Sequence, residues 1–227
     1  MVLERHPGVL KGLLDPLTRF FRHVDPNVIT WMSLPFALLA ASLYYRSTPE
    51  TAAENYYLLY AGLSVSVMGI MDLLDGRIAR MMGKATASGD FLDHVMDRWL
   101  DVMLIVGISF SAWADMRVGL FAIIGVLLTS YMGTQAQAVG AGRLYGGALT
   151  RADRIVILIG GPYIDHILVI TGTQIPIPAS IPGAQHALGL VLWYFAVMGI
   201  LTSLQRFVRI LLVLRARERG AAPPEDK

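Results

Sequence analysis

Six apolar stretches of the chain are each long enough to form a membrane-spanning helix. They cover residues 27–45, 56–75, 91–113, 117–139, 152–172 and 187–212. A helix needs about 20 residues to cross the hydrocarbon core of a bilayer. The third stretch differs from the others because Asp93, Asp97, Arg98 and Asp101 stand in its first half. The pattern predicts an all-α bundle of six transmembrane helices.

Residues 8–24 have a different pattern, in which apolar side chains recur at helical spacing between charged ones. The charged residues are Lys11, Asp15, Arg19 and Arg22. Such a helix lies at the membrane surface with its apolar face toward the acyl chains, or packs as a soluble helix on the bundle. Because a predicted span follows directly, we interpret it as an interfacial helix, which Pro16 is expected to bend.

These patterns divide the chain into three parts. Residues 1–25 form the juxtamembrane amphipathic helix, and residues 26–216 form the six-helix domain. Residues 217–227 are polar, contain two prolines and are expected to be a disordered tail. The segment 171–185 is predicted to be a loop between the last two spans.

Basic residues are distributed unequally between the two sides of the predicted bundle. Of the 19 lysines and arginines, 16 fall on the side of both termini, and the opposite loops hold only Arg46 and Arg117. Cytoplasmic loops of membrane proteins carry the excess of Lys and Arg. The distribution therefore predicts a multi-pass plasma-membrane protein with both termini in the cytoplasm.

The composition supports a membrane protein and excludes several kinds of binding and catalytic site. Only 16% of the residues are charged, against about 25% in soluble domains. The formal net charge of +2 gives no basic field for nucleic acid. Cysteine is absent, which excludes disulfides, thiolate metal ligands and a cysteine nucleophile. Any metal must therefore be held by oxygen or imidazole.

Four aspartates stand within or beside the second and third spans. Asp72 and Asp75 are three residues apart and Asp93 and Asp97 are four apart, so each pair shares a helix face. The short connection predicts that the two helices are antiparallel neighbours, with both pairs near the cytoplasm. Because one charge at membrane depth costs at least about 2.5–3.5 kcal/mol, four carboxylates need cations. With His94 interpreted as structural, they favour a hard ion, Mg²⁺ or Mn²⁺.

Small residues and one arginine accompany the aspartates. Gly76 and Ala79 follow on the helix of the first pair, and Gly89 precedes the second pair. Glycine costs about 1 kcal/mol inside a helix, so its presence here indicates close approach by a ligand or a neighbouring helix. Arg80, one turn past Gly76, is placed to meet phosphate charge.

Together these residues form the pattern D-x2-D-G-x2-A-R-x8-G-x3-D-x3-D. Its fixed positions are Asp72, Asp75, Gly76, Ala79, Arg80, Gly89, Asp93 and Asp97. The pattern resembles the signature of the CDP-alcohol phosphotransferase family, and eight identities within 26 residues make the resemblance specific. Six spans, an N-terminal interfacial helix and the PNVIT segment that opens the first span are similar to the same family, so the resemblance covers most of the chain.

The resemblance implies a membrane enzyme of phospholipid synthesis. Family members bind a CDP-linked lipid, CDP-diacylglycerol or an ether equivalent, in a cavity open to the cytoplasm. An alcohol attacks the phosphate attached to the lipid, and CMP leaves. By this resemblance Asp72, Asp75 and Asp93 hold the metal, and Asp97, also near it, is the general base. Two ions, Mg²⁺ or Mn²⁺, suit such an in-line displacement, and members are generally homodimers.

Two interpretations stay open for Asn27 and Thr30 at the start of the first span. A polar residue ahead of an apolar helix commonly caps its free N–H groups. The resemblance instead brings this end of the span to the cytidine. The expected CDP-lipid site then consists of Asn27, Thr30, Asp72, Gly76, Ala79, Arg80 and Gly89.

Arginines at two helix ends are the candidates for binding the acceptor. Arg151 and Arg154 begin the fifth span, and Arg206 and Arg209 end the sixth, each pair three residues apart. The positive-inside rule alone explains them, but two converging pairs would also form a phosphate pocket.

The segments around these arginines bear on the identity of the acceptor. TRADR and LQRFVR resemble family members that accept inositol phosphate, the phosphatidylinositol- or archaetidylinositol-phosphate synthase branch. TQAQAVG, at the end of the fourth span, lacks the basic residues usual there. We expect inositol phosphate or glycerol phosphate as the acceptor, with an unphosphorylated alcohol such as serine as the alternative.

The aspartates have two other interpretations. They would form ion pairs with Arg77, Arg80 and Arg98 that hold helices together, or they would line a divalent-cation transporter, with acids near mid-membrane on broken helices. Neither alternative requires the full signature. Asp90 and Asp101 flank it and are interpreted as ion-pair or supporting residues. The loop 143–147 has no assigned role.

Overall fold

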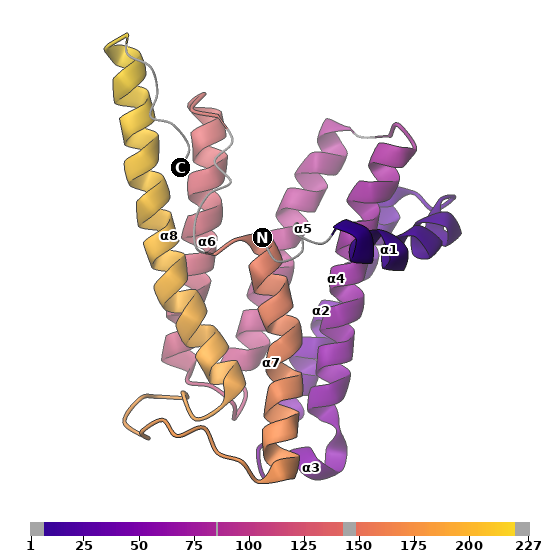
Figure 1. Cartoon of the computed structure of the whole chain (residues 1–227), viewed down its shortest axis with the longest axis vertical. Coiled ribbons are helices and arrows are strands. Elements are labelled where there is room, and N and C mark those ends of the chain that lie inside the picture. The colour runs from indigo at the N-terminus through magenta and orange to yellow at the C-terminus, as the bar shows by residue number, and fades with distance from the viewer. Residues whose placement is uncertain (1–6, 85, 143–148, 221–227) are drawn as a thin grey trace.

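The computed structural model describes residues 7–84, 86–142 and 149–220, where all regular secondary structure is α-helix (Figure 1). The helices are α1 Pro7–Phe21, α2 Pro26–Arg46, α3 Ala52–Asn55, α4 Tyr57–Met81, α5 Ala87–Ser109, α6 Met116–Ala138, α7 Arg151–Thr171 and α8 Ala187–Glu218. The prediction of an all-α protein is confirmed. The short helix α3 was not predicted, and residues 143–147 lie outside the described ranges.

Five of these helices, α2, α4, α6, α7 and α8, are long and apolar enough to cross a membrane, so the chain is a polytopic membrane protein. Helix α5 has a similar length, 23 residues. Its first four turns carry the charged residues Asp90, Asp93, Asp97, Arg98 and Asp101. These charges set α5 apart from the other long helices.

The six long helices form a closed ring, and α5 and α8 also pack on each other across it. Following the contacts around it, the order is α2, α4, α7, α8, α6 and α5, and α5 returns to α2. Glycines allow close approach at two of these contacts. A Cβ on Gly199 of α8 would lie 2.7 Å from the carbonyl carbon of Gly125 in α6, and one on Gly107 of α5 would lie 2.5 Å from Cα of Ala41 in α2. The ring is therefore packed backbone to backbone at these points.

Helix α1 lies beside α4 and packs on the bundle there (Figure 1). Leu14 is buried in a small apolar cluster with Ile29 of α2 and with Leu74 and Ile78 of α4. Asp15 of α1 also forms an ion pair with Arg77 of α4. The helix begins at residue 7 and ends at residue 21 instead of 24, and it continues through the predicted bend at residue 16.

Two helices extend beyond their apolar stretches. Helix α4 runs to Met81, six residues past the predicted end of the span, so Asp72 and Asp75 lie within it. Helix α8 runs to Glu218, so the first residues of the predicted disordered tail are helical instead. Arg215 and Arg217 in its last turn favour this extension, because cations stabilise the C-terminal end of a helix. Residues 221–227 of that tail lie outside the described part.

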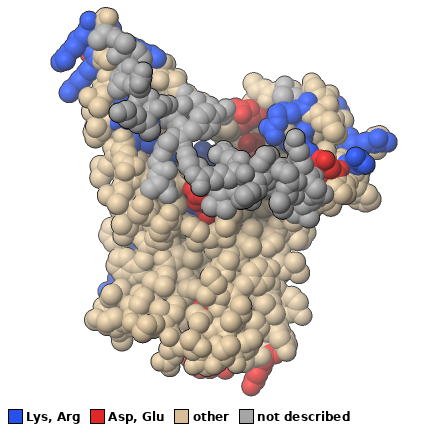
Figure 2. Space-filling model, in the orientation of Figure 1, with Lys and Arg blue, Asp and Glu red and all other residues tan. Residues whose placement is uncertain are grey.

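The charged residues are concentrated at one end of the molecule. Figure 2 shows the Lys and Arg side chains of one face mostly at its upper end, where α1 lies and α8 finishes, with a largely uncharged band below. The aspartates of α4 and α5 lie toward the same end, since α4 ends there and α5 begins there. This distribution agrees with an apolar band in the membrane and a polar end outside it.

Candidate active site

The two aspartate pairs converge although their helices do not pack closely on each other. Helices α4 and α5 are antiparallel, and both pack on α2. The prediction that they are direct neighbours is therefore wrong. Close packing of α4 on α5 would leave no room between their carboxylates, whereas packing of both on α2 leaves space for a site.

Three of the four aspartates form a close cluster, which we call the carboxylate cluster. Asp72, Asp93 and Asp97 each offer one oxygen within 4.8 Å of the others. The side chains of Asp72 and Asp97 are only 8% and 7% exposed, so water does little to screen their repulsion. Carboxylate oxygens are the ligands that Mg²⁺ and Mn²⁺ prefer. The donor set therefore fits a hard divalent cation.

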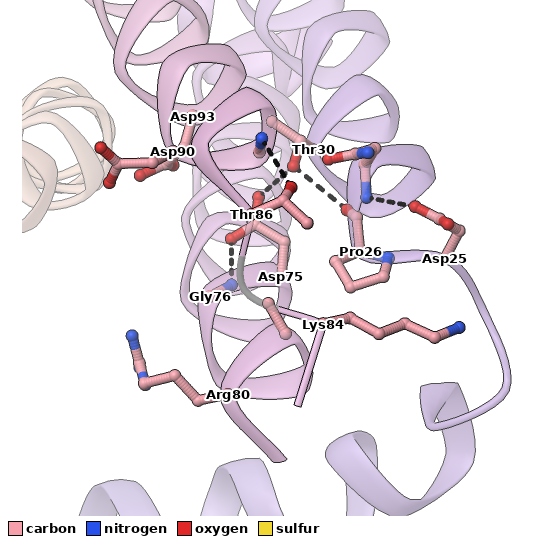
Figure 3. Close-up of a pocket in the computed structure, with 13 residues that line it drawn as sticks. Asp25, Pro26, Thr30, Asp75, Gly76, Arg80, Lys84, Thr86, Asp90 and Asp93 are labelled. Carbon is pink, nitrogen blue, oxygen red and sulfur yellow. Dashed lines mark hydrogen bonds between the residues drawn. The ribbon is translucent and has the colours of Figure 1, made fainter. Parts of the chain in front are cut away.

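Asp75 lies beside the carboxylate cluster and is fixed by hydrogen bonds. Its Oδ2 accepts a bond of 2.6 Å from the hydroxyl of Thr30, and its Oδ1 accepts one of 2.5 Å from the backbone N–H of Gly76 (Figure 3). The Thr30 hydroxyl thus connects α2 to α4. The helix cap of α2 is Asp25, which accepts a bond of 2.9 Å from the N–H of Asn27. The capping interpretation of Asn27 and Thr30 is therefore wrong.

One cavity, which we call the signature cavity, has a volume of about 330 Å³ (Figure 3). It is lined by Asp25, Pro26, Asn27, Thr30, Asp75, Gly76, Ala79, Arg80, Lys84, Thr86, Gly89, Asp90 and Asp93. All the residues predicted for the CDP-lipid site except Asp72 are among them. Lys84 and Thr86 were not predicted to line this site, because they lie in the connection between two predicted spans and carry no motif.

Gly89 marks a tight point on the wall of the signature cavity. Thr86 caps α5 by accepting a hydrogen bond of 3.1 Å from the N–H of Gly89. A Cβ on Gly89 would lie 3.2 Å from the Thr86 hydroxyl oxygen and 3.5 Å from the side-chain oxygen of Asn27. A Cβ here would therefore crowd the Thr86 hydroxyl and come into van der Waals contact with Asn27. This contact explains a glycine in the first turn of α5.

A second cavity, which we call the arginine cavity, has a volume of about 290 Å³. It is lined by His94, Asp97, Arg98, Thr129, Ser130, Gly133, Thr134, Gln137, Leu149, Thr150, Arg151, Arg154 and Arg206. Three of the four predicted acceptor arginines meet here, and Arg209 is not among the lining residues. Arg98 and His94 also line this cavity, although their sequence positions had suggested only structural roles.

Two arginines at the start of α7 have different partners. Arg151 places Nη2 at 2.5 Å from Oδ1 of Asp72 and at 2.5 Å from Oδ1 of Asp97. Arg154 donates from Nε and Nη2 to Oδ2 of Asp101, at 3.1 and 2.7 Å. Both members of this second pair are 4% exposed. The ion-pair interpretation of Asp101 is confirmed.

Other ion pairs only partly match the alternative in which arginines neutralise the aspartates. Arg98 is 3.2 Å from Oδ2 of Asp97, as that alternative requires. Arg77 pairs with Asp15 of α1 instead of with a signature aspartate. Arg206 donates a hydrogen bond of 2.7 Å to the carbonyl of Thr129, which holds its side chain against α6.

Comparison with known proteins identifies the family. The family model for CDP-alcohol phosphatidyltransferases matches residues 23–215, which contain the whole signature. The chain belongs to the CDP-alcohol phosphatidyltransferase family. As a CDP-alcohol phosphatidyltransferase it is a membrane transferase of phospholipid biosynthesis.

Similar proteins include two archaeal enzymes and a solved bacterial structure. Archaetidylinositol phosphate synthase of Pyrococcus horikoshii is 32% identical over 135 residues, which are 60% of this chain and 67% of that protein. The Methanothermobacter thermautotrophicus protein of the same name is 29% identical over 71% of this chain and 83% of its own. The structure of Mycobacterium tuberculosis phosphatidylinositol phosphate synthase with CDP-DAG bound has a TM-score of 0.65 at 25% identity, covering 86% of this chain and 92% of that one.

A second structure of the Mycobacterium tuberculosis protein, in complex with manganese and citrate, also has a TM-score of 0.65. It is 24% identical to this chain, and the match covers 86% of this chain and 88% of that one. The likeness shows that this CDP-alcohol phosphatidyltransferase has the same fold.

Proposed function

We propose that this CDP-alcohol phosphatidyltransferase transfers the lipid-linked phosphate of a CDP-lipid to inositol phosphate and releases CMP. The observation that carries the proposal is the position of the carboxylate cluster between two cavities. Asp93 lines the signature cavity and Asp97 lines the arginine cavity. A donor in the first and an acceptor in the second would meet at the carboxylates.

The signature cavity suits the CDP part of the donor. Gly76 and Ala79 leave its α4 wall without large side chains, and Arg80 and Lys84 bring positive charge. A cation beside phosphate oxygens forms charge-assisted hydrogen bonds. We propose Asn27, Thr30, Asp72, Gly76, Ala79, Arg80 and Gly89 as the residues that bind the CDP-lipid. Its lipid tails would remain among the membrane helices.

We propose that Asp72, Asp75, Asp93 and Asp97 hold Mg²⁺ or Mn²⁺, with two ions as the expected number. The close oxygens of Asp72, Asp93 and Asp97 support this, as does the manganese complex of the Mycobacterium tuberculosis protein. Bound divalent ions neutralise pyrophosphate charge and stabilise a leaving phosphate. Asp75, held by Thr30 and Gly76, would keep its orientation in the site.

Asp97 is the proposed general base. It belongs to the carboxylate cluster and also lines the arginine cavity, so an acceptor hydroxyl there would be close to its oxygens. A carboxylate within hydrogen-bond reach can take the proton of the attacking hydroxyl. The proton would therefore pass from the acceptor to Asp97 as the new phosphate ester bond forms.

The arginine cavity favours a phosphorylated acceptor. Arg154 and Arg206 come from α7 and α8, and Arg151 lies at the same wall. Their guanidinium groups would offset the repulsion between an anionic acceptor and the carboxylates. Arg209 does not line the cavity and remains a candidate for acceptor binding only because it lies three residues after Arg206 on α8. The names of the archaeal relatives support inositol phosphate, with glycerol phosphate as a second possibility and serine as the unphosphorylated alternative.

The structure does not favour a cation transporter. Asp72 and Asp75 stand in the last ten residues of α4, and Asp93 and Asp97 stand in the first eleven of α5. Both helices are continuous through the aspartates. Transport sites instead lie near mid-membrane, commonly on broken helices.

Acceptor-dependent CMP release tests the proposed function. Purified protein in detergent would be incubated with Mn²⁺ or Mg²⁺ and either CDP-diacylglycerol or its ether equivalent. The acceptors to compare are inositol phosphate, glycerol phosphate, inositol and serine. We expect CMP and a new phospholipid, with inositol phosphate as the best acceptor. No CMP with any combination would reject the transferase function, and a clear preference for serine would reject the phosphorylated acceptor.

We propose that α5 also crosses the membrane, so that the chain has six spans. The chain would then consist of an interfacial helix over residues 1–25, a six-helix domain over residues 26–216 and a polar tail. Both termini and the site would then face the cytoplasm from the plasma membrane. The family resemblance adds a homodimer to this proposal. The unequal distribution of basic residues supports the orientation.

Single cysteines on either side of α5 test this topology, since the chain has no cysteine of its own. Lys84, before α5, and Arg117, after it, are both exposed. We expect a membrane-impermeant maleimide to label Arg117→Cys from outside intact cells and Lys84→Cys only after permeabilisation. Labelling of both from the same side would show that α5 does not cross the membrane.

A further inference from the structure

Arg151 contacts the carboxylate cluster in an unusual way for a structural ion pair. A single nitrogen, Nη2, is 2.5 Å from one oxygen of Asp72 and 2.5 Å from one oxygen of Asp97. Its Nε is buried and has no hydrogen-bond partner among the residues the structure describes. The side chain therefore acts as a point charge between two carboxylates and does not use its planar fork.

Arg154, one turn further along α7, forms a fixed ion pair with Asp101 in the same surroundings and can be compared with Arg151. Two of its nitrogens, Nε and Nη2, donate to one carboxylate oxygen of Asp101. Asp101 does not belong to the carboxylate cluster. Arg154 can therefore keep its partner whatever the cluster binds, whereas Arg151 cannot.

Arg151 and a divalent ion would compete for the same oxygens. Asp72 and Asp97 supply two of the three carboxylates of the cluster. A guanidinium and a divalent cation a few ångströms apart repel each other, and little water is present to screen them. Arg151 would therefore have to leave these oxygens when an ion binds. The arginine cavity, which Arg151 also lines, offers the space to turn into.

We propose that Arg151 is a positioning residue with two places. It bridges Asp72 and Asp97 when no divalent ion is bound, and it turns into the arginine cavity, toward the anionic group of the acceptor, when one is. The proposal rests on the proposed function, since it requires the carboxylate cluster to hold a divalent ion. Binding of a divalent ion to the carboxylate cluster would then also move Arg151 into the arginine cavity, where it completes the site for the anionic group of the acceptor. Because coupling between two sites is reciprocal, an anion in the cavity would also strengthen ion binding.

Mn²⁺ affinity, measured without substrates, tests the exchange. The full-length protein in detergent would be titrated with Mn²⁺ while free ion is followed by electron paramagnetic resonance. We expect Arg151→Gln to bind Mn²⁺ at least about tenfold more tightly than wild type, because the competing cation is gone. Arg151→Lys should lie between the two, because it keeps the charge.

Arg206→Gln is the matched control. It removes the same charge from the same cavity, but Arg206 has a hydrogen bond to the carbonyl of Thr129 in place of the contact with the cluster. We expect its Mn²⁺ affinity to stay within about threefold of wild type. Equal or weaker Mn²⁺ binding by Arg151→Gln would overturn the exchange. Absence of Mn²⁺ binding by wild type would instead overturn the proposed metal site itself.

Thermal unfolding gives a second measurement, which follows the stability of the protein with and without the ion. In chelator, Arg151→Gln should unfold at a lower temperature than wild type, because Asp72 and Asp97 lose their shared cation. Saturating Mn²⁺ should remove most of that difference, since Arg151 no longer holds the carboxylates in either protein. A loss of Tm that is the same with and without Mn²⁺ would show a fixed structural ion pair and would reject the exchange.

Discussion

Asp97→Asn is expected to lower turnover by about 10²–10⁴-fold, the usual contribution of a general base. Asparagine keeps the size of the side chain and one oxygen for coordination, but it cannot accept the proton of the acceptor hydroxyl. The side chain of Asp97 is buried and lies where the carboxylate cluster meets the arginine cavity, so few water molecules could replace it. The kcat for CMP release measures the effect, and CDP-lipid binding should be largely kept.

Asp101→Asn is the matched control for this prediction. Asp101 is a buried aspartate one turn further along α5, but it contacts Arg154 and lies outside the carboxylate cluster. Its replacement is expected to act on acceptor binding and to leave kcat within about tenfold of wild type. Similar losses of kcat for both variants would indicate a general effect of removing a buried charge. Unchanged turnover for Asp97→Asn would remove Asp97 from the mechanism.

The helices and the aspartate site could be predicted because both have strong local causes. Apolar stretches of bilayer length predict helices, and charges within such stretches are costly enough to indicate a site. Spacing along a helix also placed Asp93 and Asp97 on one face, and both belong to the cluster. Asp72 joins them from α4. Asp75 shares the face but is held by Thr30 of α2, a residue 45 positions away.

Contacts between distant segments could not be predicted in the same way. A short connection suggested that α4 packs on α5, but the close approach of Gly107 to Ala41 fixes α5 on α2 instead. Arg151 and Arg154 share a helix face, yet Arg151 contacts carboxylates on both α4 and α5, whereas Arg154 contacts a different carboxylate, on α5 alone. Periodicity shows which side chains are neighbours along one helix, and the packing of other helices decides their partners.

Helix ends were also hard to predict, since they do not coincide with the ends of apolar stretches. Helix α8 continues through Arg215 and Arg217, whose charges favour the C-terminal end of a helix. Capping of α2 was one of two open interpretations of Asn27 and Thr30, but Asp25 provides the cap. An aspartate two residues earlier offers an equally good acceptor, and spacing alone does not choose between them.

Arg154→Ala and Arg206→Ala are expected to raise the KM of a phosphorylated acceptor while leaving that of the CDP-lipid nearly unchanged. An arginine–phosphate contact contributes about 1.5–3 kcal/mol, which corresponds to about 10- to 150-fold in affinity. Both residues line the arginine cavity, and neither lines the signature cavity. Steady-state kinetics with each substrate varied in turn would separate the two effects.

The pair of Arg154 with Asp101 requires a second variant, because Arg154→Ala alone leaves a buried carboxylate without its partner. An unpaired buried charge is strongly destabilising and could by itself distort the cavity. Combining Arg154→Ala with Asp101→Asn removes that charge. If Arg154 binds the acceptor phosphate, the double variant keeps the raised acceptor KM while its Tm recovers. If the acceptor KM returns to the wild-type value in the double variant, the single variant acted through Asp101, and the phosphate contact of Arg154 is rejected.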